Sequence, residues 1–508
     1  MARIIQLRHC SLSSLTKPNH PNYYLSDTLL PSVLQNYIDS NSPKSAQTIH
    51  SQIVKSGLKP TTTICIKLLL LHIKSGSLYN AHKVLDKMPE PTIAAFSYLI
   101  SGYLKHGLIK EPLELVRRLT FSNHRLDKFT LSMVLKISSM LSLLNFTRQV
   151  HAHMVKYHFE PEDVLLSALI DSYVKLGKLN YAQLLFNTMS NRTVVFATSL
   201  IVGYFNEGLY EHAQVVFNEI SEKDIVVYNA MIAGYSKATE TAVSSLKTYK
   251  GMQKLGFQPN ISSFVSVLGA CSLLSDLDFG SQVHCQIIKE KLFSQVKAAS
   301  ALINFYSKCG CIEEARKIFD EMRHKNVISW TSMIDGYGRN GLPYDALKLF
   351  DEKTSVVHVQ PNHATLLTVL STCSHNGLVS EGRKIFQNME RIYLLKPQME
   401  HYACMVDMFG RRGLLGEAYE LIKGMKMKPS VDVWAALLSA CRMHGNVEMA
   451  KLAAGEVFEL SKNKRPGSYM AFSHSLADAG KWDGAYEVRE LMNQRGVAKG
   501  AASSEVWS

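Results

Sequence analysis

Three short groups of histidine, cysteine and glutamate are the places where this sequence could hold a metal or perform acid–base chemistry. They are His158-x-Glu160, Cys309-x-Cys311 and His151-x-His153. A zinc deaminase needs an H-x-E group with a downstream P-C-x-x-C, so that a glutamate and a zinc-bound water can attack the base. No C-x-x-C occurs in the sequence, and His151 and His153 would point to different faces of a helix. We therefore expect no metal site.

Motifs for other chemistry are also missing. The sequence contains no Walker loop, no G-x-S-x-G elbow and no dinucleotide fingerprint. We therefore expect a chain that is not an enzyme, has no catalytic residue and uses no cofactor.

The charge and hydropathy of the chain limit its partners. The formal net charge of +13 suits a polyanionic partner, although charge alone does not separate RNA from DNA or a membrane surface. No apolar run reaches the roughly 18 residues that span a bilayer. The densest run, Leu68 to Leu71, lies beside Lys67 and is typical of a protein core. We expect no membrane insertion.

Nine cysteines are scattered along the chain without a C-x-x-C pair, so neither a zinc knuckle nor a disulfide framework is indicated. They fit free thiols in a reducing compartment, and most occupy apolar or small-residue positions of expected helices. The first 26 residues carry Arg3, Arg8 and Lys17 with several serines, and no acid precedes Asp27. This composition is typical of an organellar transit peptide, and a disordered tail is the alternative.

A glycine with a fixed spacing indicates that the chain is built of repeats. The spacings between successive glycines of this set are 31, 70, 31, 102, 31, 36 and 36 residues, and each equals 31 or 36 or is a sum of 31, 35 and 36. The glycines are Gly76, Gly107, Gly177, Gly208, Gly310, Gly341, Gly377 and Gly413. A glycine at such a place is typical of the end of a helix.

Apolar residues keep the same spacing around that glycine. A tyrosine lies four residues before it, as in Tyr173 and Tyr306. An alanine follows it by five residues and a phenylalanine by nine, as in Ala315 and Phe319. These spacings place Tyr on one face of a first helix, and Ala and Phe on one face of a second. Because one hairpin cannot bury its own apolar face, neighbouring hairpins must stack.

Several segments with this pattern resemble pentatricopeptide repeats, among them VVYNAMIAGYSK, ALINFYSKCGCIEEARKIFDEM and VISWTSMIDGYGRNGLPYDALKLF. The mixture of unit lengths is similar to that of the plant PLS subfamily. L-type units of that subfamily carry QTIH, RQVH and SQVH, which end here at His50, His151 and His284. The resemblance covers about residues 27–495 and implies an all-α, right-handed superhelical solenoid. A tetratricopeptide array would keep to 34 residues and a different Trp and Pro pattern.

About twelve repeats of P, L and S types are expected over residues 27–430. Their bounds are 27–61, 62–92, 93–127, 128–162, 163–193, 194–224, 225–260, 261–295, 296–326, 327–362, 363–398 and 399–430. The resemblance implies single-stranded RNA as the partner, with one base read per repeat by the fifth and the last residue. An aspartate accepts from the imino N–H of G or U, whereas an asparagine offers the donor and acceptor that A or C needs.

The family's pairings then assign five positions of the RNA. Ser97/Asp127 and Thr198/Asp224 favour G, Asn229/Asn260 favours a pyrimidine, and Ser300/Asn326 and Thr331/Asn362 favour A. Weaker candidates for base selection are Ser132/Glu162, Ser167/Thr193 and Ala403/Ser430, whose bases stay open. Also open are Pro31/Thr61, Ile66/Thr92, Val265/Gln295 and Leu367/Gln398. The expected target is NNGNNGYNAANN. Turn chemistry is the competing interpretation of the last positions, because Pro-Asn also suits a loop, and both interpretations can hold together.

The region after the repeats resembles the two E motifs of plant PLS proteins that act in C-to-U editing. The resemblance rests on residues 433–460 and 480–497, and we expect helical hairpins over 431–497. The family continues with Lys-x-Pro-Gly-x-Ser-Trp, whereas the tail at 498–508 has Lys499-Gly500-Ala501-Ala502-Ser503-Ser504 before Trp507. No deaminase (DYW) domain follows in this sequence.

These features lead to a main hypothesis and two alternatives. The main one is site recognition for organellar C-to-U RNA editing, with a separate deaminase and editing-complex proteins as partners. The second keeps RNA binding but assigns splicing, stability or translation. The third is a protein-interaction scaffold, since helical solenoids often serve this role. The expected compartment is the mitochondrion, with the chloroplast as the alternative.

Overall fold

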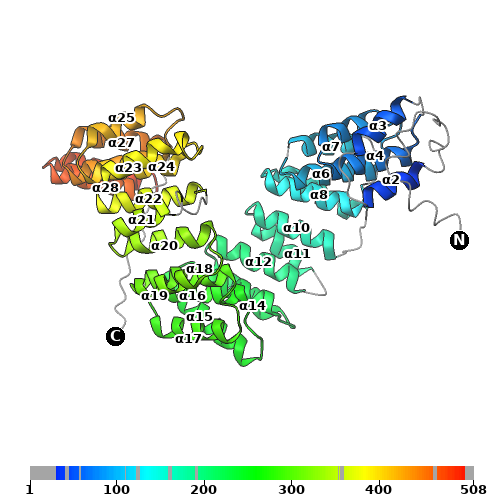
Figure 1. Cartoon of the computed structure of the whole chain (residues 1–508). Helices are drawn as coiled ribbons and strands as arrows, with labels where there is room; N and C mark the ends of the chain where they lie inside the picture. The colour runs from blue at the N-terminus through cyan, green and yellow to red at the C-terminus, as the bar shows by residue number, and fades with distance from the viewer. Residues whose placement is uncertain are drawn as a thin grey trace. The chain divides into compact units, whose positions relative to one another are not determined.

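The computed structural model describes residues 30–39, 45–55, 59–108, 110–121, 126–157, 163–188, 193–352, 354, 360–460 and 466–497. Throughout these ranges every regular element is a helix (Figure 1), which confirms the all-α class. The expected transit peptide at 1–26, the tail at 498–508 and Glu162 lie outside the described residues. None of the described helices is long and apolar enough to cross a membrane.

The chain divides into two compact units, residues 1–227 and 228–508. The helices of the first unit alternate between the first and second helix of a hairpin. They are α2 (Leu30–Asp39), α3 (Ser45–Lys55), α4 (Thr62–Lys74), α5 (Leu78–Asp86), α6 (Ile93–Lys105), α7 (Lys110–Phe121), α8 (Lys128–Met140), α9 (Leu144–Lys156), α10 (Asp163–Lys175), α11 (Leu179–Asn187), α12 (Val194–Asn206) and α13 (Tyr210–Glu219).

The second unit continues the alternation, and α14 begins three residues before its boundary. Its helices are α14 (Ile225–Tyr235), α15 (Thr239–Lys254), α16 (Ile261–Leu274), α17 (Leu277–Lys289), α18 (Val296–Lys308), α19 (Ile312–Glu321), α20 (Val327–Arg339), α21 (Pro343–Asp351), α22 (His363–Asn376), α23 (Val379–Arg391), α24 (Met399–Arg411), α25 (Leu415–Lys423), α26 (Val431–Met443), α27 (Val447–Leu460), α28 (Pro466–Asp478) and α29 (Trp482–Gln494).

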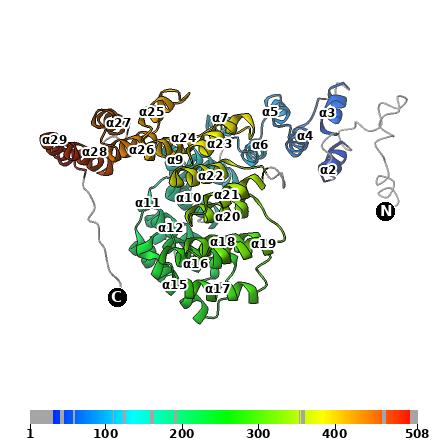
Figure 2. The ribbon, with the colours of Figure 1, turned by 60° about the vertical axis from the view of Figure 1, so that its left-hand side comes forward.

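Within each unit the hairpins form a solenoid. First helices pack on one another in succession, from α16 through α18 and α20 to α22, and each of these four also packs on its own second helix. Figure 2 shows the first helices α16, α18, α20 and α22 in succession. First helices begin at Thr62, Ile93 and Ile261, among others. The repeat units expected from the sequence start at the same three residues.

The hairpin of α20 and α21 shows why the sequence folds this way. Trp330, Met333 and Ile334 are buried at the i, i+3, i+4 spacing of a helix face. Gly341 follows α20 with a φ of +72°, a conformation that costs glycine little. Pro343 then opens α21 at the first helical position, where its missing N–H is not needed.

The repeating glycines all take this left-handed conformation, with φ between +65° and +81°. At the corresponding place in the units 128–162 and 261–295, a serine replaces the glycine. Ser142 and Ser275 nevertheless have φ of +56° and +53°. The shape of the turn is therefore kept where the sequence signal is lost, at the cost of a strained residue.

A small residue, usually alanine, lies five residues after the repeat glycine and lets the second helix approach its neighbours closely. Ala182, Ala315 and Ala346 are completely buried. At the same place α17 has Gly280, and a methyl group there would overlap the ring of Phe305 from α18. Phe305 itself is completely buried. A large residue on the next first helix is therefore matched by the loss of a side chain on the second helix.

Where a first helix carries the repeat tyrosine, its hydroxyl can bond the second helix before it, as two pairs show. The hydroxyl of Tyr173 lies 3.0 Å from Nδ1 of His151, and that of Tyr306 lies 3.0 Å from Nδ1 of His284. In α4 a histidine takes the tyrosine position, and His72 Nε2 lies 3.0 Å from His50 Nδ1. The three histidines of the QTIH, RQVH and SQVH segments thus join neighbouring hairpins. Among the described residues, no group of histidine, cysteine and acid side chains could hold a metal.

Candidate nucleic-acid interface

The last residue of a repeat is the N-cap of the first helix that follows. Asp127 accepts a hydrogen bond from the backbone N–H of Thr130 at 2.7 Å. Asn260, Asn326 and Asn362 accept in the same way from Ser263, Ser329 and Thr365, at 3.1, 3.0 and 2.9 Å. Asp224 accepts from Val226 and Val227 at 2.9 and 3.0 Å. Thr193 and Ser430 precede their helices without a side-chain cap bond. Helix capping therefore explains the Asp and Asn at these positions, as the turn interpretation expects.

The cap bond also fixes the orientation of each asparagine amide. A backbone N–H can only donate, so the atom that faces it must be the carbonyl oxygen Oδ1. The nitrogen Nδ2 of Asn260, Asn326 and Asn362 therefore points away from the helix end, and all three residues are exposed. An aspartate cap keeps a second carboxylate oxygen for the same place. The asparagine ends present a donor, and the aspartate ends present an acceptor.

The fifth residues differ in burial. Thr198, Asn229 and Thr331 are half-buried, as are Ser132, Ser167 and Ala403. Ser97 and Ser300 are only 3% and 6% exposed. Ser97 bonds Thr130 through its hydroxyl at 2.6 Å, whereas the hydroxyl of Ser300 has no partner. Thr198 and Thr331 each donate to a carbonyl of the first turn, at 2.7 Å.

One expected pair is joined by a direct bond. Asn229 donates from Nδ2 to Oδ1 of Asn260 at 3.2 Å. Two other pairs are joined through a third residue, Thr130 for Ser97/Asp127 and Thr365 for Thr331/Asn362. Thr198 with Asp224 and Ser300 with Asn326 share no hydrogen bond among the described residues. The fold thus brings three of the five base-assigning pairs into contact.

Sequence reasoning missed a set of exposed apolar side chains beside the caps. Each is the second residue of a first helix, and their exposed fractions run from 52% to 63%. They are Phe129, Val195, Val226 and Ile328. A single exposed apolar side chain is normal on a protein surface, so the informative feature is its recurrence at the same position of four repeats. The signal in the sequence was a recurring apolar residue two places after the repeat end.

Cations end many of the first helices. Lys74, Lys105, Lys175, Lys308, Arg339 and Arg411 are the last residues of α4, α6, α10, α18, α20 and α24. The negative end of the helix dipole favours a cation there. Lys175, Arg339 and Arg411 each pair with an aspartate one turn earlier, at 2.6 to 2.7 Å. Within the part of the chain that the structure describes, Lys308 and Lys105 have no such aspartate partner.

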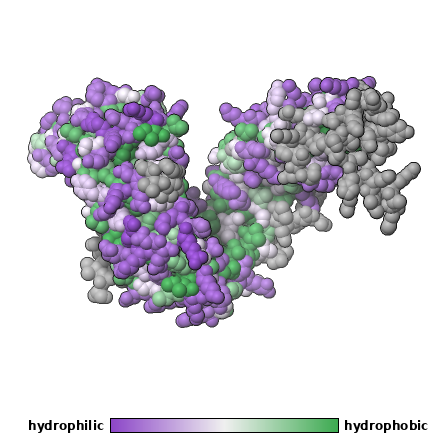
Figure 3. Space-filling model, viewed as in Figure 1, coloured by the Kyte–Doolittle hydropathy of each residue, from purple (hydrophilic) through white to green (hydrophobic). Residues whose placement is uncertain are grey.

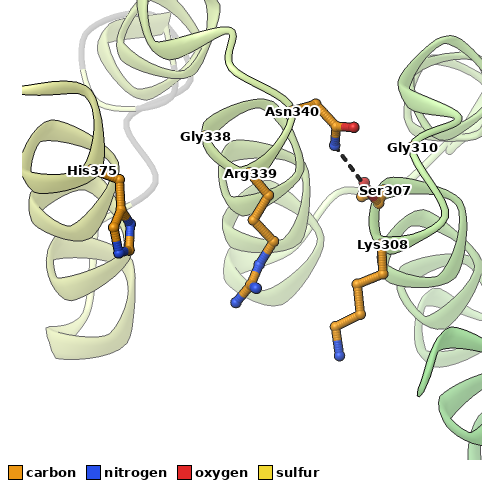
Figure 4. Close-up of a pocket in the computed structure, with 7 residues that line it drawn as sticks. All are labelled: Ser307, Lys308, Gly310, Gly338, Arg339, Asn340 and His375. Atoms are coloured by element: carbon orange, nitrogen blue, oxygen red, sulfur yellow. Dashed lines mark hydrogen bonds between the residues drawn. The ribbon is translucent and has the colours of Figure 1, made fainter. Parts of the chain in front are cut away.

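A pocket of about 420 Å³ lies beside the ends of α18, α20 and α22, the first two of which end in a cation. Ser307, Lys308, Gly310, Gly338, Arg339, Asn340 and His375 line it. Figure 4 shows Lys308 and Arg339 extending in the same direction from neighbouring helices. Asn340 donates to the carbonyl of Ser307 at 2.8 Å and so joins the two helix ends. Its lining contains Lys308, Arg339 and His375 and no acid, which suits an anion, although Arg339 already pairs with Asp335.

The thiols are not built for nucleophilic chemistry. The eight described cysteines are free, and four of them are buried. Burial raises the pKa of Cys271, Cys373 and Cys404 to about 12. These thiols are protonated at neutral pH and are poor nucleophiles.

In Figure 3 apolar side chains are interspersed among hydrophilic ones on the visible surface.

Comparison with known sequences identifies the repeat. The family described as PPR repeat matches residues 94–123, 164–194, 195–225, 226–240, 298–327, 328–354, 364–394 and 400–429. A mitochondrial pentatricopeptide repeat-containing protein of Arabidopsis thaliana is 50% identical over 471 residues, which cover 92% of this chain and 90% of the relative. The chloroplastic protein CRR2 of the same plant is 32% identical over 465 residues, covering 90% of this chain and 66% of that protein.

Comparison with solved structures gives the same fold. The crystal structure of PPR10 from maize aligns with a TM-score of 0.62 at 18% identity, over 98% of this chain and 72% of that one. PPR10 in complex with an 18-nt psaJ RNA element aligns with a TM-score of 0.52 at 17% identity, over 98% and 84%. Repeats of matching sequence, a near full-length relative and a shared helical-hairpin fold lead to one conclusion: the chain belongs to the pentatricopeptide repeat protein family.

Proposed function

We propose that this chain binds single-stranded RNA sequence-selectively in a plant organelle and marks a cytidine for editing by a deaminase that another protein supplies. RNA binding is supported by the similarity to PPR10, which was crystallised with an RNA element. A plant organelle is supported by the mitochondrial and chloroplastic relatives. The mitochondrion is the first choice, because the relative with 50% identity carries that designation.

The observation that carries the proposal is the fixed polarity of the repeat ends. Asn260, Asn326 and Asn362 turn a donor outward, while Asp127 and Asp224 keep a free acceptor. The Watson–Crick edges of A and C carry a ring-nitrogen acceptor, and those of G and U carry an imino donor. An asparagine end therefore selects A or C, and an aspartate end selects G or U. The fifth residue of the repeat then separates purines from pyrimidines: the family's pairings put Ser or Thr with a purine and Asn with a pyrimidine.

Two further features suit a single strand. The exposed side chains of Phe129, Val195, Val226 and Ile328 lie beside the caps and can contact the faces of unstacked bases. Lysines and arginines at the ends of first helices, with the pocket at Lys308 and Arg339, supply phosphate contacts. Selective polar groups, apolar contacts and cations together meet the needs of sequence-selective RNA binding.

The editing role rests on the C-terminal region. The hairpins α26/α27 and α28/α29 follow the last expected base-selecting pair, and they resemble the E motifs of PLS proteins. We assign them to the recruitment of the deaminase and its complex. This assignment gives the RNA-binding repeats and the recruiting hairpins separate places in the chain.

The test is deep sequencing of mitochondrial and plastid transcripts from plants with and without a functional copy of the gene. The expected result is lost conversion at one or a few cytidines, each with a match to NNGNNGYNAANN shortly upstream. Complete editing at all sites would overturn the editing role. A retained intron or a missing transcript end in the same data would then point to splicing or stabilisation. Re-expression with Asp127→Ala and Asp224→Ala combined is expected to leave the affected sites unedited.

A further inference from the structure

Three repeats are followed by a buried hydroxyl that neither the repeat spacing nor the family pairings single out. Thr130, Ser263 and Thr365 are each the third residue of a first helix, and each is completely buried. Each lies three residues after a capping Asp or Asn. Their side chains reach back toward the fifth residue of the preceding repeat, which comes 33 or 34 residues earlier.

The network around Ser263 is the most complete. Its backbone N–H donates to Oδ1 of Asn260 at 3.1 Å, and its hydroxyl donates to Oδ1 of Asn229 at 2.6 Å. Asn229 in turn donates to Asn260 at 3.2 Å. Each of the three residues therefore bonds both of the others. The two amides of the expected pair are held in one relative orientation.

The other two hydroxyls make the same connection. Thr365 donates from its hydroxyl to Oδ1 of Asn362 at 2.9 Å, and its oxygen lies 2.8 Å from that of Thr331. Thr130 lies 2.6 Å from the hydroxyl of Ser97, while its backbone N–H caps onto Asp127. In all three repeats the buried residue joins the fifth residue to the last: its hydroxyl contacts the fifth residue, and its backbone N–H caps onto the last.

Two repeats lack this connection and act as natural contrasts. Val227 follows Thr198/Asp224 and has no hydroxyl, yet its backbone N–H still caps onto Asp224 at 3.0 Å. Ser329 follows Ser300/Asn326, but its hydroxyl donates to the backbone carbonyl of Asn326 at 2.9 Å. Capping therefore does not need the hydroxyl link, and the link has to serve something else.

We propose that Thr130, Ser263 and Thr365 are positioning residues that sharpen the base discrimination of the preceding repeat. This inference rests on the proposed RNA binding. Each of these residues caps the last side chain through its backbone N–H, and its hydroxyl holds the fifth side chain in a fixed position relative to that cap. The hydroxyl thereby removes alternative rotamers in which the pair would offer a different set of donors and acceptors to the base. Linked pairs therefore discriminate more sharply than Thr198/Asp224 and Ser300/Asn326.

The experiment measures RNA affinity of the full chain with single-nucleotide changes in a matched RNA. Thr365→Val keeps the shape of the side chain and the backbone cap, as Val227 does naturally. RNAs with A or G at the tenth position of NNGNNGYNAANN report the repeat 327–362, and changes at the seventh position report 225–260. We expect Thr365→Val to lower the A-over-G preference at the tenth position about threefold to tenfold, the range of one lost hydrogen bond. The preference at the seventh position stays as in the wild type.

Further variants separate positioning from stability. Thr365→Ser is expected to restore the wild-type preference, since it restores the hydroxyl. Val227→Thr is expected to raise the G preference at the sixth position. Ser263→Ala repeats the test at the seventh position, and so serves if Thr365→Val does not fold. An unchanged preference in Thr365→Val, or an equal loss at both positions, would overturn the inference.

The two levels of failure give different data. If the wild-type chain shows no base preference at any position, the proposed function fails and this inference with it. If the wild type discriminates and Thr365→Val discriminates equally, only the positioning role is wrong.

Discussion

Asn260, Asn326 and Asn362 turn the oxygen of the side-chain amide toward a backbone N–H and the nitrogen toward solvent. At the scale of single residues, this orientation decides what each repeat offers to a ligand. An aspartate at the same place would cap the helix equally well. It would replace the outward donor with an acceptor at almost no change in volume.

Asn362→Asp tests this consequence. We expect the base preference at the tenth RNA position to move from A toward G, because the imino N–H of G needs an acceptor. The measurement is binding of RNAs that differ only at that position. Asn446→Asp is the matched control, since Asn446 caps the second helix α27 through the N–H of Met449 at 3.0 Å. A parallel shift in the control, or an unchanged preference in Asn362→Asp, would contradict the prediction.

The sequence could place these residues at the repeat ends but could not give the orientation of their side-chain amides. The repeat spacing and the family resemblance together pick out Asn229 and Asn260. Which atom of each amide faces outward depends on the backbone N–H of Ser263 and on its hydroxyl. Neither contact is visible until the helix start is placed in three dimensions. The burial of Ser97 and Ser300 was equally hidden, because a fifth-position serine looks the same in sequence whether or not it is exposed.

At the scale of helices and hairpins, a smaller side chain on one helix compensates for a larger side chain on its neighbour. Gly280 on α17 makes room for Phe305 on α18, and Gly382 at the same repeat position on α23 makes room for Met408 on α24. The spacing of the sequence predicted the alanine positions well, since a single residue type recurs there. It gave no sign of the exchange at Gly280, because the compensating residue lies 25 positions away on another helix.

Gly280→Ala is therefore expected to destabilise the protein by about 1–3 kcal/mol, the usual cost of overpacking. The double variant Gly280→Ala with Phe305→Ala should cost less than the sum of the two single changes, because the methyl group then has space. Urea unfolding of the four proteins gives the coupling free energy. Additive effects would show that the glycine is not there for the ring.

The junction of α3 and α4 is expected to respond to pH. Burial, with a smaller contribution from His50, lowers the pKa of His72 from 6.5 to about 4. The unfolded chain therefore takes up a proton more readily than the folded one as the pH falls from 6.5 toward 4. Stability from the neutral His72 is present above pH 6.5 and is lost toward pH 4, on the order of 2 kcal/mol.

Hydrogen exchange of the α4 amides, corrected for the intrinsic effect of pH, measures this loss. His72→Gln should show a weaker fall in protection between pH 6.5 and 4, whereas the exposed His324→Gln should behave as the wild type does. Identical pH dependence in His72→Gln and the wild type would show that another group carries the effect.

At the scale of the whole molecule, an excess of positive charge sets affinity without setting sequence. The net charge is +13, and cations recur at the ends of first helices. The sequence predicted a polyanionic partner from this charge. It could not say which lysines serve, because the last residue of a helix is known only once the helix bounds are known.

Lys308→Ala is expected to weaken binding evenly across RNA sequences. It should also lower the slope of log affinity against log salt by about 0.7, the value for one phosphate contact on a single strand. Lys289→Ala is the control, since Lys289 is an exposed last residue of the second helix α17. Equal effects of the two changes, or a loss confined to one RNA sequence, would argue against a phosphate contact at Lys308.

Where the last residue of a repeat caps the next helix through its side chain, as Asp127, Asn260, Asn326 and Asn362 do, its possible replacements are few. Asn, Asp, Ser and Thr cap well, and most other residues cost about 1 kcal/mol. An exchange among these four residues leaves the neighbouring helix intact. Under the base selection that we propose, a repeat could therefore acquire a new preference without a compensating change elsewhere. On this proposal, single substitutions that do not disturb the fold could change the transcript that such a protein binds. The same four residue types would be enough to redesign its target sequence.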